Sequence, residues 1–439
     1  MRSNWTMICL ALLAAGWAGT AAGAKPNILL IMADDVGTDA VGCYGGQSYP
    51  TPHIDALARG GMQFSHGYAM PVCHPSRVCL TTGRYPFRFG PAGSKWGDFP
   101  RDGESLTIAH RLKQAGYATA VAGKWQLCMM RDDLEHPRRL GFDQWCLFGW
   151  HEGGRYHDPL IYQNGAPRDD TAGKYGPDLY VDFLLEFMKR SQAGGQPFFA
   201  YYPMALCHDV TDDLKGQHVP FYQHGRWMTY GEMIASMDDM VGRLIAGLEQ
   251  LGLRESTLVL FTTDNGTAAA SYLSVDANGK MTRPPVFNIR DGRVVRGGKG
   301  KFDDTGTRVP VIANWPGRIQ PGSKTDTMVD LTDYLPTMAD VAGLAAEATP
   351  RDGISFAPVL FGEPRKRDRP WIYIDLRGSR CVRSPHWKLY DDGRFYDLQA
   401  DPDEQTPLEP NSLPPSARAE RQRLREALDG LRGPLAVRE

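Results

Sequence analysis

Acidic side chains follow two apolar segments that lie far apart in the sequence. Asp34 and Asp35 come directly after the first segment, and Asp264 and Asn265 come directly after the second. Adjacent carboxylates repel each other and stay ionised only beside a cation or several hydrogen-bond donors. Three carboxylates and an amide are hard oxygen ligands of the kind that Ca²⁺ or Mg²⁺ prefers. The sequence therefore predicts a divalent metal site if the fold joins the two segments, although each pair alone could also form a turn or helix cap.

These residues need elements that bring them together, and the chain alternates apolar runs with amphipathic stretches. Near-continuous apolar runs are typical of strands buried on both faces of a parallel sheet. We expect strands at residues 27–33, 118–123, 197–206 and 257–263, and helices at residues 105–115, 179–190 and 233–251. This alternation predicts a doubly wound, mostly parallel α/β sheet with helices on both faces. Ligands of such a sheet bind beyond the carboxyl ends of its strands.

The character of the sequence changes near residue 349, where arginine and proline become frequent. Short strands are predicted at residues 371–376, 387–390 and 395–398, and a charged helix at residues 416–431. We therefore expect a small C-terminal α+β subdomain with an antiparallel sheet. The predicted organisation is a signal peptide at 1–24, a catalytic α/β domain at 25–348 and the subdomain at 349–439.

The N-terminus has the order of charged, apolar and small residues that is typical of a secretory signal. Arg2 precedes an apolar run at residues 7–18, and small residues lead to Ala24. The run is too short to span a bilayer, so we expect a secreted or periplasmic protein without stable membrane insertion. The net charge of −2 gives no basic face for nucleic acid. The seven cysteines after the signal are scattered without a CxxC pair, which argues against a zinc ribbon.

One motif carries a resemblance to a known family. The segment Cys73-His74-Pro75-Ser76-Arg77, followed by Leu80-Thr81-Thr82-Gly83-Arg84, resembles the signature of type I, formylglycine-dependent sulfatases of the alkaline-phosphatase-like superfamily. Further matches follow in the family's order: Pro26-Asn27, Asp34-Asp35, residues 51–58, Gly123-Lys124-Trp125, Asp264-Asn265-Gly266, Gly298-Lys299-Gly300, Arg308-Val309-Pro310, Tyr396-Asp397-Leu398 and residues 401–404. The resemblance covers nearly the whole chain after the signal.

The resemblance implies the chemistry of a sulfuric ester hydrolase. A maturation enzyme would oxidise Cys73 to formylglycine, whose hydrate carries two hydroxyls on one carbon. One hydroxyl would attack sulfur, and the other would expel sulfate and regenerate the aldehyde, which splits a hard step into two easier ones. The implied cofactor is Ca²⁺, with Mg²⁺ as the alternative, and it would take up charge on the sulfate oxygens.

The resemblance also assigns roles to individual residues. It implies that the metal is held by Asp34, Asp35, Cys73, Asp264 and Asn265. Arg77 would hold the hydrate, and Lys124 and Lys299 would bind the sulfate oxygens, because fixed cations stabilise a transferring oxyanion. Lys301 is the alternative to Lys299, which better matches the family's G-K-G. His208 follows a predicted strand where the family places a histidine that contacts sulfate and can protonate the leaving alcohol.

The sequence departs from the family at Gln126, where a histidine is typical. That histidine takes the proton that drives sulfate release, and glutamine cannot accept a proton near neutral pH. Three interpretations stay open. Another base serves, with His74, His151 and His157 as candidates; sulfate release is slow; or the protein is a catalytically impaired homologue that binds glycans.

Substrate specificity is expected to lie in the insertion at residues 149–176. Its ring-bearing and basic side chains are Trp150, His151, Arg155, Tyr156 and His157. They could line a sugar-binding cleft, or the insertion could be a packed loop with a solvated arginine. Export favours a sulfated glycan as the substrate. A phosphonate monoester or phosphodiester hydrolase with the same apparatus is the alternative, and paired aryl sulfate and aryl phosphonate assays would separate the two.

Overall fold

A ten-stranded sheet forms the centre of the protein. The structure is a computed structural model that describes residues 25–93, 95–148, 152–209, 229–270, 274–275, 281–345 and 349–431. The expected signal peptide lies outside the described residues. Across the sheet the strands are β14 (Ser323–Asp330), β2 (Met62–Tyr68), β13 (Val311–Asn314), β8 (Thr257–Thr263), β1 (Asn27–Ala33), β7 (Phe198–Pro203), β3 (Ala118–Lys124), β4 (Gln144–Phe148), β5 (Ile161–Gln163) and β6 (Ala166–Pro167).

Five adjacent strands of this sheet, from β8 through β1, β7 and β3 to β4, run parallel. Their carboxyl ends therefore meet at one edge. β1 and β8 pair in register from Asn27 with Thr257 to Ala33 with Thr263, so the residues that follow the two strands emerge side by side. β13 runs antiparallel to both of its neighbours. The predicted mostly parallel α/β sheet is confirmed.

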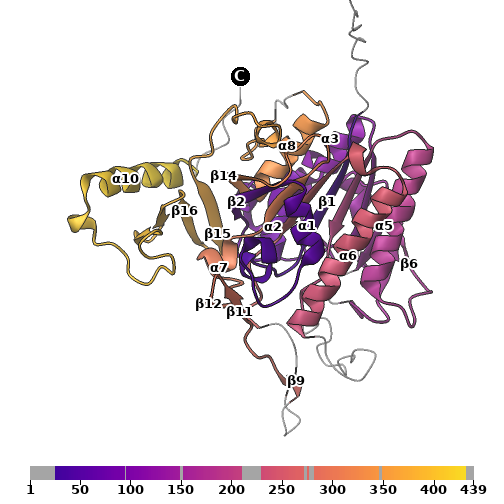
Figure 1. Ribbon diagram of the computed structural model, residues 1–439, viewed down its shortest axis with the longest axis horizontal. Helices are drawn as coiled ribbons and strands as arrows, with labels where there is room; N and C mark the ends of the chain where they lie inside the picture. Colours follow the sequence, from indigo (N-terminus) through magenta and orange to yellow (C-terminus); the bar gives the residue numbers. More distant parts are fainter. Residues whose placement is uncertain are drawn as a thin grey trace, which may run out of the picture.

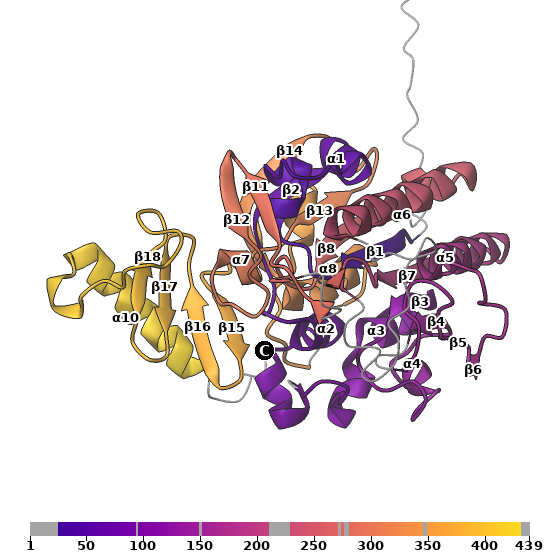
Figure 2. The ribbon, with the colours of Figure 1, turned by 90° about the horizontal axis from the view of Figure 1, so that it is seen from below.

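Helices cover both faces of the sheet, as the view in Figure 2 shows. Alternate residues of β1 point to opposite faces: Leu30 packs in one apolar cluster and Ile31 in the other. The cluster around Ile31 includes α1 (Pro52–Arg59), α5 (Gly176–Ala193) and α6 (Tyr230–Gln250). The cluster around Leu30 includes α2 (Cys73–Thr82), α3 (Ile108–Gln114) and α8 (Tyr334–Val341).

A separate antiparallel sheet lies beside the large one near the C-terminus (Figure 1). It consists of β15 (Ile372–Leu376), β16 (Ser379–Arg383), β17 (Trp387–Tyr390) and β18 (Phe395–Asp397), and α10 (Pro415–Gly430) packs on it. The sequence analysis missed β16. Of its residues, Cys381 and Val382 are apolar, whereas Ser379, Arg380 and Arg383 are polar, so no apolar run marks it as a strand.

The remaining short elements are β9 (Ser274–Val275), β10 (Met281–Thr282), β11 (Phe287–Arg290), β12 (Arg293–Arg296), α4 (His136–Arg139), α7 (Asp304–Thr307) and α9 (Ala357–Leu360). Among the described residues, no helix has the length and apolarity that crossing a membrane requires.

A buried histidine in α4 makes stability depend on pH. Trp125 Nε1 donates a hydrogen bond to His136 Nδ1 over 2.9 Å. Burial, followed by the charge of Arg139, lowers the pKa of His136 to about 4. The unfolded chain therefore binds the proton more readily, and this contribution to stability is complete above pH 6.5 and is lost as the pH falls towards 4. We expect the free energy of unfolding to fall by about 3 kcal/mol over that range.

Urea unfolding from pH 7 to pH 4 measures this effect. In His136→Asn, which keeps an acceptor near the position of Nδ1, the fall in the free energy of unfolding between pH 7 and pH 4 should be smaller by about 3 kcal/mol. In His386→Asn, which replaces an exposed histidine, that fall should equal the one in wild type. An equal fall in the free energy of unfolding in wild type and His136→Asn would contradict the prediction.

Candidate active site

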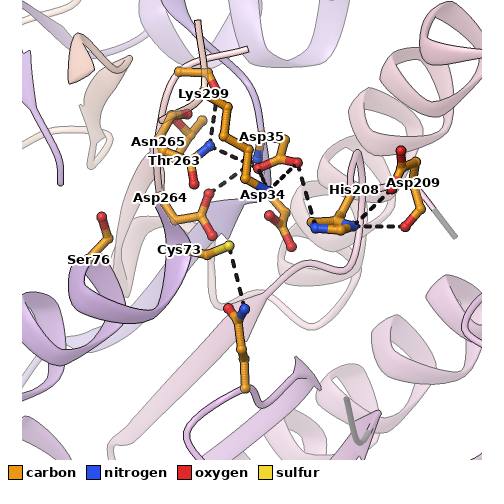
Figure 3. A network of polar contacts seen from close by, with 12 residues as sticks. Asp34, Asp35, Cys73, Ser76, His208, Asp209, Thr263, Asp264, Asn265 and Lys299 are labelled. Carbon is orange, nitrogen blue, oxygen red and sulfur yellow. Dashed lines mark hydrogen bonds and ion pairs between the residues drawn. The ribbon is translucent and has the colours of Figure 1, made fainter. Parts of the chain in front are cut away.

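The carboxyl ends of β1 and β8 bring Asp34 and Asp35 into contact with Asp264 and Asn265 (Figure 3). The backbone N–H of Asp35 donates to Asp264 Oδ1 over 3.2 Å, and Asn265 Nδ2 donates to Asp35 Oδ1 over 2.8 Å. All four side chains, including that of Asp34, are buried. Asp35 adopts the left-handed backbone conformation, with φ 59°, which is uncommon outside glycine and clusters at functional sites. The parallel sheet thus joins the two segments that the sequence analysis singled out.

Cys73 enters this cluster from the first residue of α2. Val72 before it is extended, Pro75 stands in the first turn where a missing N–H costs no helix bond, and Gly83 closes the helix in the left-handed conformation. The Cys73 sulfur and oxygens of Asp34 and Asp35 lie within 4.8 Å of one another. Burial raises the pKa of the Cys73 thiol, so the unmodified side chain is a neutral thiol and a weak nucleophile.

Three cations surround the carboxylates. Lys124 at the end of β3 contacts Asp34 Oδ2, and Lys299 Nζ lies 2.8 Å from both oxygens of Asp35. Arg77, one turn after Cys73 in α2, donates to Asp264 Oδ2 over 2.7 Å. The three carboxylates and three cations balance in formal charge.

Local backbone geometry places the two lysines. Gly123 precedes Lys124 with φ +124°, and a Cβ there would lie 2.1 Å from the carbonyl oxygen of Pro203 in β7, so only glycine permits this close approach. The N–H of Lys299 donates to Thr267 O, and that of Gly300 donates to Pro71 O. These bonds tie the Lys299 loop to the chain on either side of the acidic cluster.

The electrostatics of the cluster favour a further cation. Burial, and then the neighbouring Asp34 carboxylate, raise the pKa of Asp264 to about 7; burial also raises the pKa of Asp35. Among the described residues, Asp34 Oδ1 and Asn265 Oδ1 are buried and have no hydrogen-bond partner. Buried acceptors without a donor are costly. The donor set and its two unpartnered oxygens therefore fit a hard divalent cation.

His208 follows β7 in the sequence, and its ring lies near Asp35. Its Nε2 is 3.9 Å from Asp35 Oδ2, and Nδ1 faces the carbonyl of Asp209 at 2.8 Å. The ring is buried, and burial, followed by the charges of Lys299 and Lys124, lowers the pKa of His208 well below its usual range. The histidine that the sequence analysis proposed thus reaches the acidic cluster.

For the insertion at residues 149–176, the expectation of a solvated arginine is wrong. Arg155 is 2% exposed and Tyr156 4%, and both contact the His208 segment, with Arg155 Nη1 2.6 Å from His208 Nδ1. Both side chains are therefore packed against the His208 segment, and Arg155 is not solvated. The sequence analysis missed these contacts because no local pattern links residue 155 to residue 208. Trp150 and His151 lie outside the described residues.

Gln126, at the position where the resemblance implies a histidine, lies beside Cys73. Its Nε2 donates to Cys73 Sγ over 3.5 Å, and its backbone is left-handed, with φ 51°. The carbonyl of Gln126 contacts His74 Nδ1 at 3.1 Å. His157, another candidate base, stacks on Tyr175 with ring centroids 4.9 Å apart.

Comparison with known proteins identifies the family to which this chain is similar. The model of the sulfatase family matches residues 26–344, and that of the N-sulphoglucosamine sulphohydrolase C-terminal region matches residues 299–429. Arylsulfatase A of Bos taurus is 32% identical over 92% of this chain and 81% of its own length. N-acetylgalactosamine-6-sulfatase of Canis lupus familiaris is 32% identical over 84% and 72% of the two chains. The crystal structure of Ps i-CgsB in complex with k-i-k-neocarrahexaose has a TM-score of 0.71 at 25% identity, over 93% and 92%.

The mixed sheet, with acidic and basic side chains gathered at its carboxyl edge, defines a hydrolase of the alkaline-phosphatase-like superfamily. Within that superfamily the chain belongs to the sulfatase family, and it is a sulfuric ester hydrolase.

Proposed function

We propose that the protein is an exported sulfatase that removes sulfate from a carbohydrate by means of a formylglycine formed from Cys73. The observation that carries this proposal is the position of Cys73, buried at the start of α2 against Asp34 and Asp35. A neutral thiol there is a poor nucleophile. Oxidation of Cys73 to formylglycine and hydration would place two hydroxyls on one carbon, one to attack sulfur and one to expel sulfate.

We propose Ca²⁺ as the cofactor, with Mg²⁺ as the alternative. Asp34, Asp35, Asp264, Asn265 and the modified Cys73 would hold it, which uses the two unpartnered oxygens of the cluster. When bound, the cation supplies stabilisation of charge on the sulfate oxygens. Because the three carboxylates and three cations already balance, a divalent ion leaves the site positive and suited to an anionic ester.

Side chains of the protein would orient the nucleophile and bind the ester. Arg77, held by Asp264, orients the nucleophilic side chain one turn before it and offsets the local negative charge. Lys124, which contacts Asp34, and Lys299, which contacts Asp35, bind sulfate oxygens. His208 presents Nε2 to an oxygen of the bound ester.

A sulfated carbohydrate is the proposed substrate class. One relative is an N-acetylgalactosamine-6-sulfatase, and one structural neighbour is in complex with k-i-k-neocarrahexaose. Removal of residues 1–24 on export would leave Lys25 as the first residue, which N-terminal sequencing of the exported protein tests. On paired substrates we expect a higher kcat/KM for an aryl sulfate than for an aryl phosphonate.

Mass spectrometry of the tryptic peptide covering residues 60–77 tests the central step. The protein should be produced in a host that oxidises such cysteines, with a known sulfatase as the control for conversion. We expect a formyl group at position 73. An unmodified thiol beside a converted control would remove the nucleophile and favour a glycan-binding protein.

Gln126→His is expected to raise turnover by about 10-fold or more. A general base contributes about 10²–10⁴-fold where proton transfer limits the rate, and histidine tolerates the left-handed backbone of this position. Pre-steady-state kinetics with an aryl sulfate should show the same attack rate and faster sulfate release. Gln126→Asn, which fits the backbone but accepts no proton, is the matched control. Equal steady-state turnover in wild type and Gln126→His would show that this position does not limit release.

A further inference from the structure

The guanidinium of Arg155 lies against the ring nitrogen of His208 that faces away from the acidic cluster. Arg155 Nη1 is 2.6 Å from His208 Nδ1 and 2.7 Å from the carbonyl oxygen of Asp209. The opposite ring nitrogen, Nε2, is the one that lies 3.9 Å from Asp35 Oδ2. Arg155 thus contacts His208 from behind, on the side remote from the proposed substrate.

This contact determines which nitrogen carries the ring proton. A guanidinium has only donors and stays protonated in proteins. Two N–H groups cannot point at each other over 2.6 Å, so Nδ1 accepts from Arg155 and carries no proton. The Asp209 carbonyl, 2.8 Å from Nδ1, is then satisfied by the same guanidinium nitrogen. The proton of a neutral ring is left on Nε2.

The surroundings hold this arrangement in place. Arg155 is 2% exposed, and its guanidinium carbon lies 5.1 Å from the centroid of the Phe148 ring, within the range of a cation–π contact. The hydroxyl of the next residue, Tyr156, lies 2.6 Å from the carbonyl oxygen of His208. One short segment therefore fixes both the ring and the backbone of the histidine.

We propose that Arg155 is a positioning residue that holds His208 in the tautomer with its proton on Nε2, so that the ring donates a hydrogen bond to an oxygen of the bound ester. The catalytic meaning of this tautomer rests on the proposed sulfatase function, while the tautomer itself can be observed in the absence of turnover. Without Arg155, the Asp209 carbonyl and the Asp209 carboxylate, whose Oδ1 lies 3.6 Å from Nδ1, would draw the proton to that nitrogen.

Long-range ¹H–¹⁵N correlation spectra of histidine-labelled protein near neutral pH test the proposal. The His208 signal is identified by its loss in His208→Asn. We expect the Nε2–H tautomer in wild type and in Arg155→Lys, which keeps a donor, and the Nδ1–H tautomer in Arg155→Met. Arg351→Met, which removes another buried arginine that contacts Thr82 and Leu106, should leave the His208 tautomer unchanged.

Kinetics provide the second readout. Arg155→Met should lower kcat/KM for a sulfate ester by about 10²-fold, the scale of losing one donor to an oxyanion, and Arg155→Lys should restore at least half of that loss on a logarithmic scale. An Nδ1–H ring in wild type, or the same tautomer in wild type and Arg155→Met, would overturn the proposal. An inactive wild type with the expected tautomers would instead count against the proposed function and leave the positioning role standing.

Discussion

Cys73→Ala is expected to reduce sulfate ester hydrolysis by about 10⁴-fold or more, because it removes the precursor of the proposed nucleophile. Cys73 is the first residue of α2, and its side chain lies against Asp34 and Asp35. Alanine fits the same helical position without adding bulk. The loss should therefore appear in kcat with little change in the unfolding midpoint.

Cys79→Ala is the matched control for this prediction. Cys79 is also buried in α2, but it packs in the apolar cluster around Leu30. Its replacement should cost some stability and leave the modification at position 73 and the turnover in place. Hydrolysis by Cys73→Ala at more than a hundredth of the wild-type rate would show that this residue is not the nucleophile.

Lys299→Ala is expected to lower kcat/KM by about 10²–10³-fold, the scale reported for removing one fixed donor to a developing oxyanion. Lys299 is held 2.8 Å from Asp35 by a loop whose backbone bonds to Thr267 and Pro71. Its proposed task is to bind a sulfate oxygen. An aryl sulfate assay measures the loss, and the effect should persist at saturating substrate.

Lys301 provides a matched control two residues away. Its side chain is 55% exposed, compared with 22% for Lys299, and it lies 4.0 Å from Asp303. Lys301→Ala should change kcat/KM by less than about 3-fold, in line with the small contribution of an exposed ion pair. Similar losses in the two variants would show that general positive potential, and not a fixed contact from Lys299, accounts for the effect.

The sequence predicted the parallel strands and the residue types at their carboxyl ends. The strand at residues 257–263 agrees with β8, and the acidic pairs after β1 and β8 do meet. Such strands can be predicted from sequence because burial on both faces produces a continuous apolar run. β16 could not be predicted in this way, because Ser379, Arg380 and Arg383 are polar and leave an apolar run of two residues.

The candidate site was predictable where short motifs carry it. The cysteine motif, the Gly-Lys pairs and the acidic pairs are local in sequence, and the structure places Cys73, Lys124, Lys299 and Asp35 in one cluster. The insertion at residues 149–176 was not predictable, because an arginine beside aromatic residues has the same composition on a surface as in a buried contact.

The sequence alone determined the family, the order of strands and helices, and the residue types available at the carboxyl ends of the strands, because these depend on local periodicity and on motifs of a few residues. The tertiary structure decided which cation faces which carboxylate, the left-handed backbone of Gln126 beside Cys73, and the contact of Arg155 with His208. Those features depend on contacts between segments that lie far apart in the sequence. Packing and the cost of burying an unpaired polar group select them, and neither leaves a pattern along the chain.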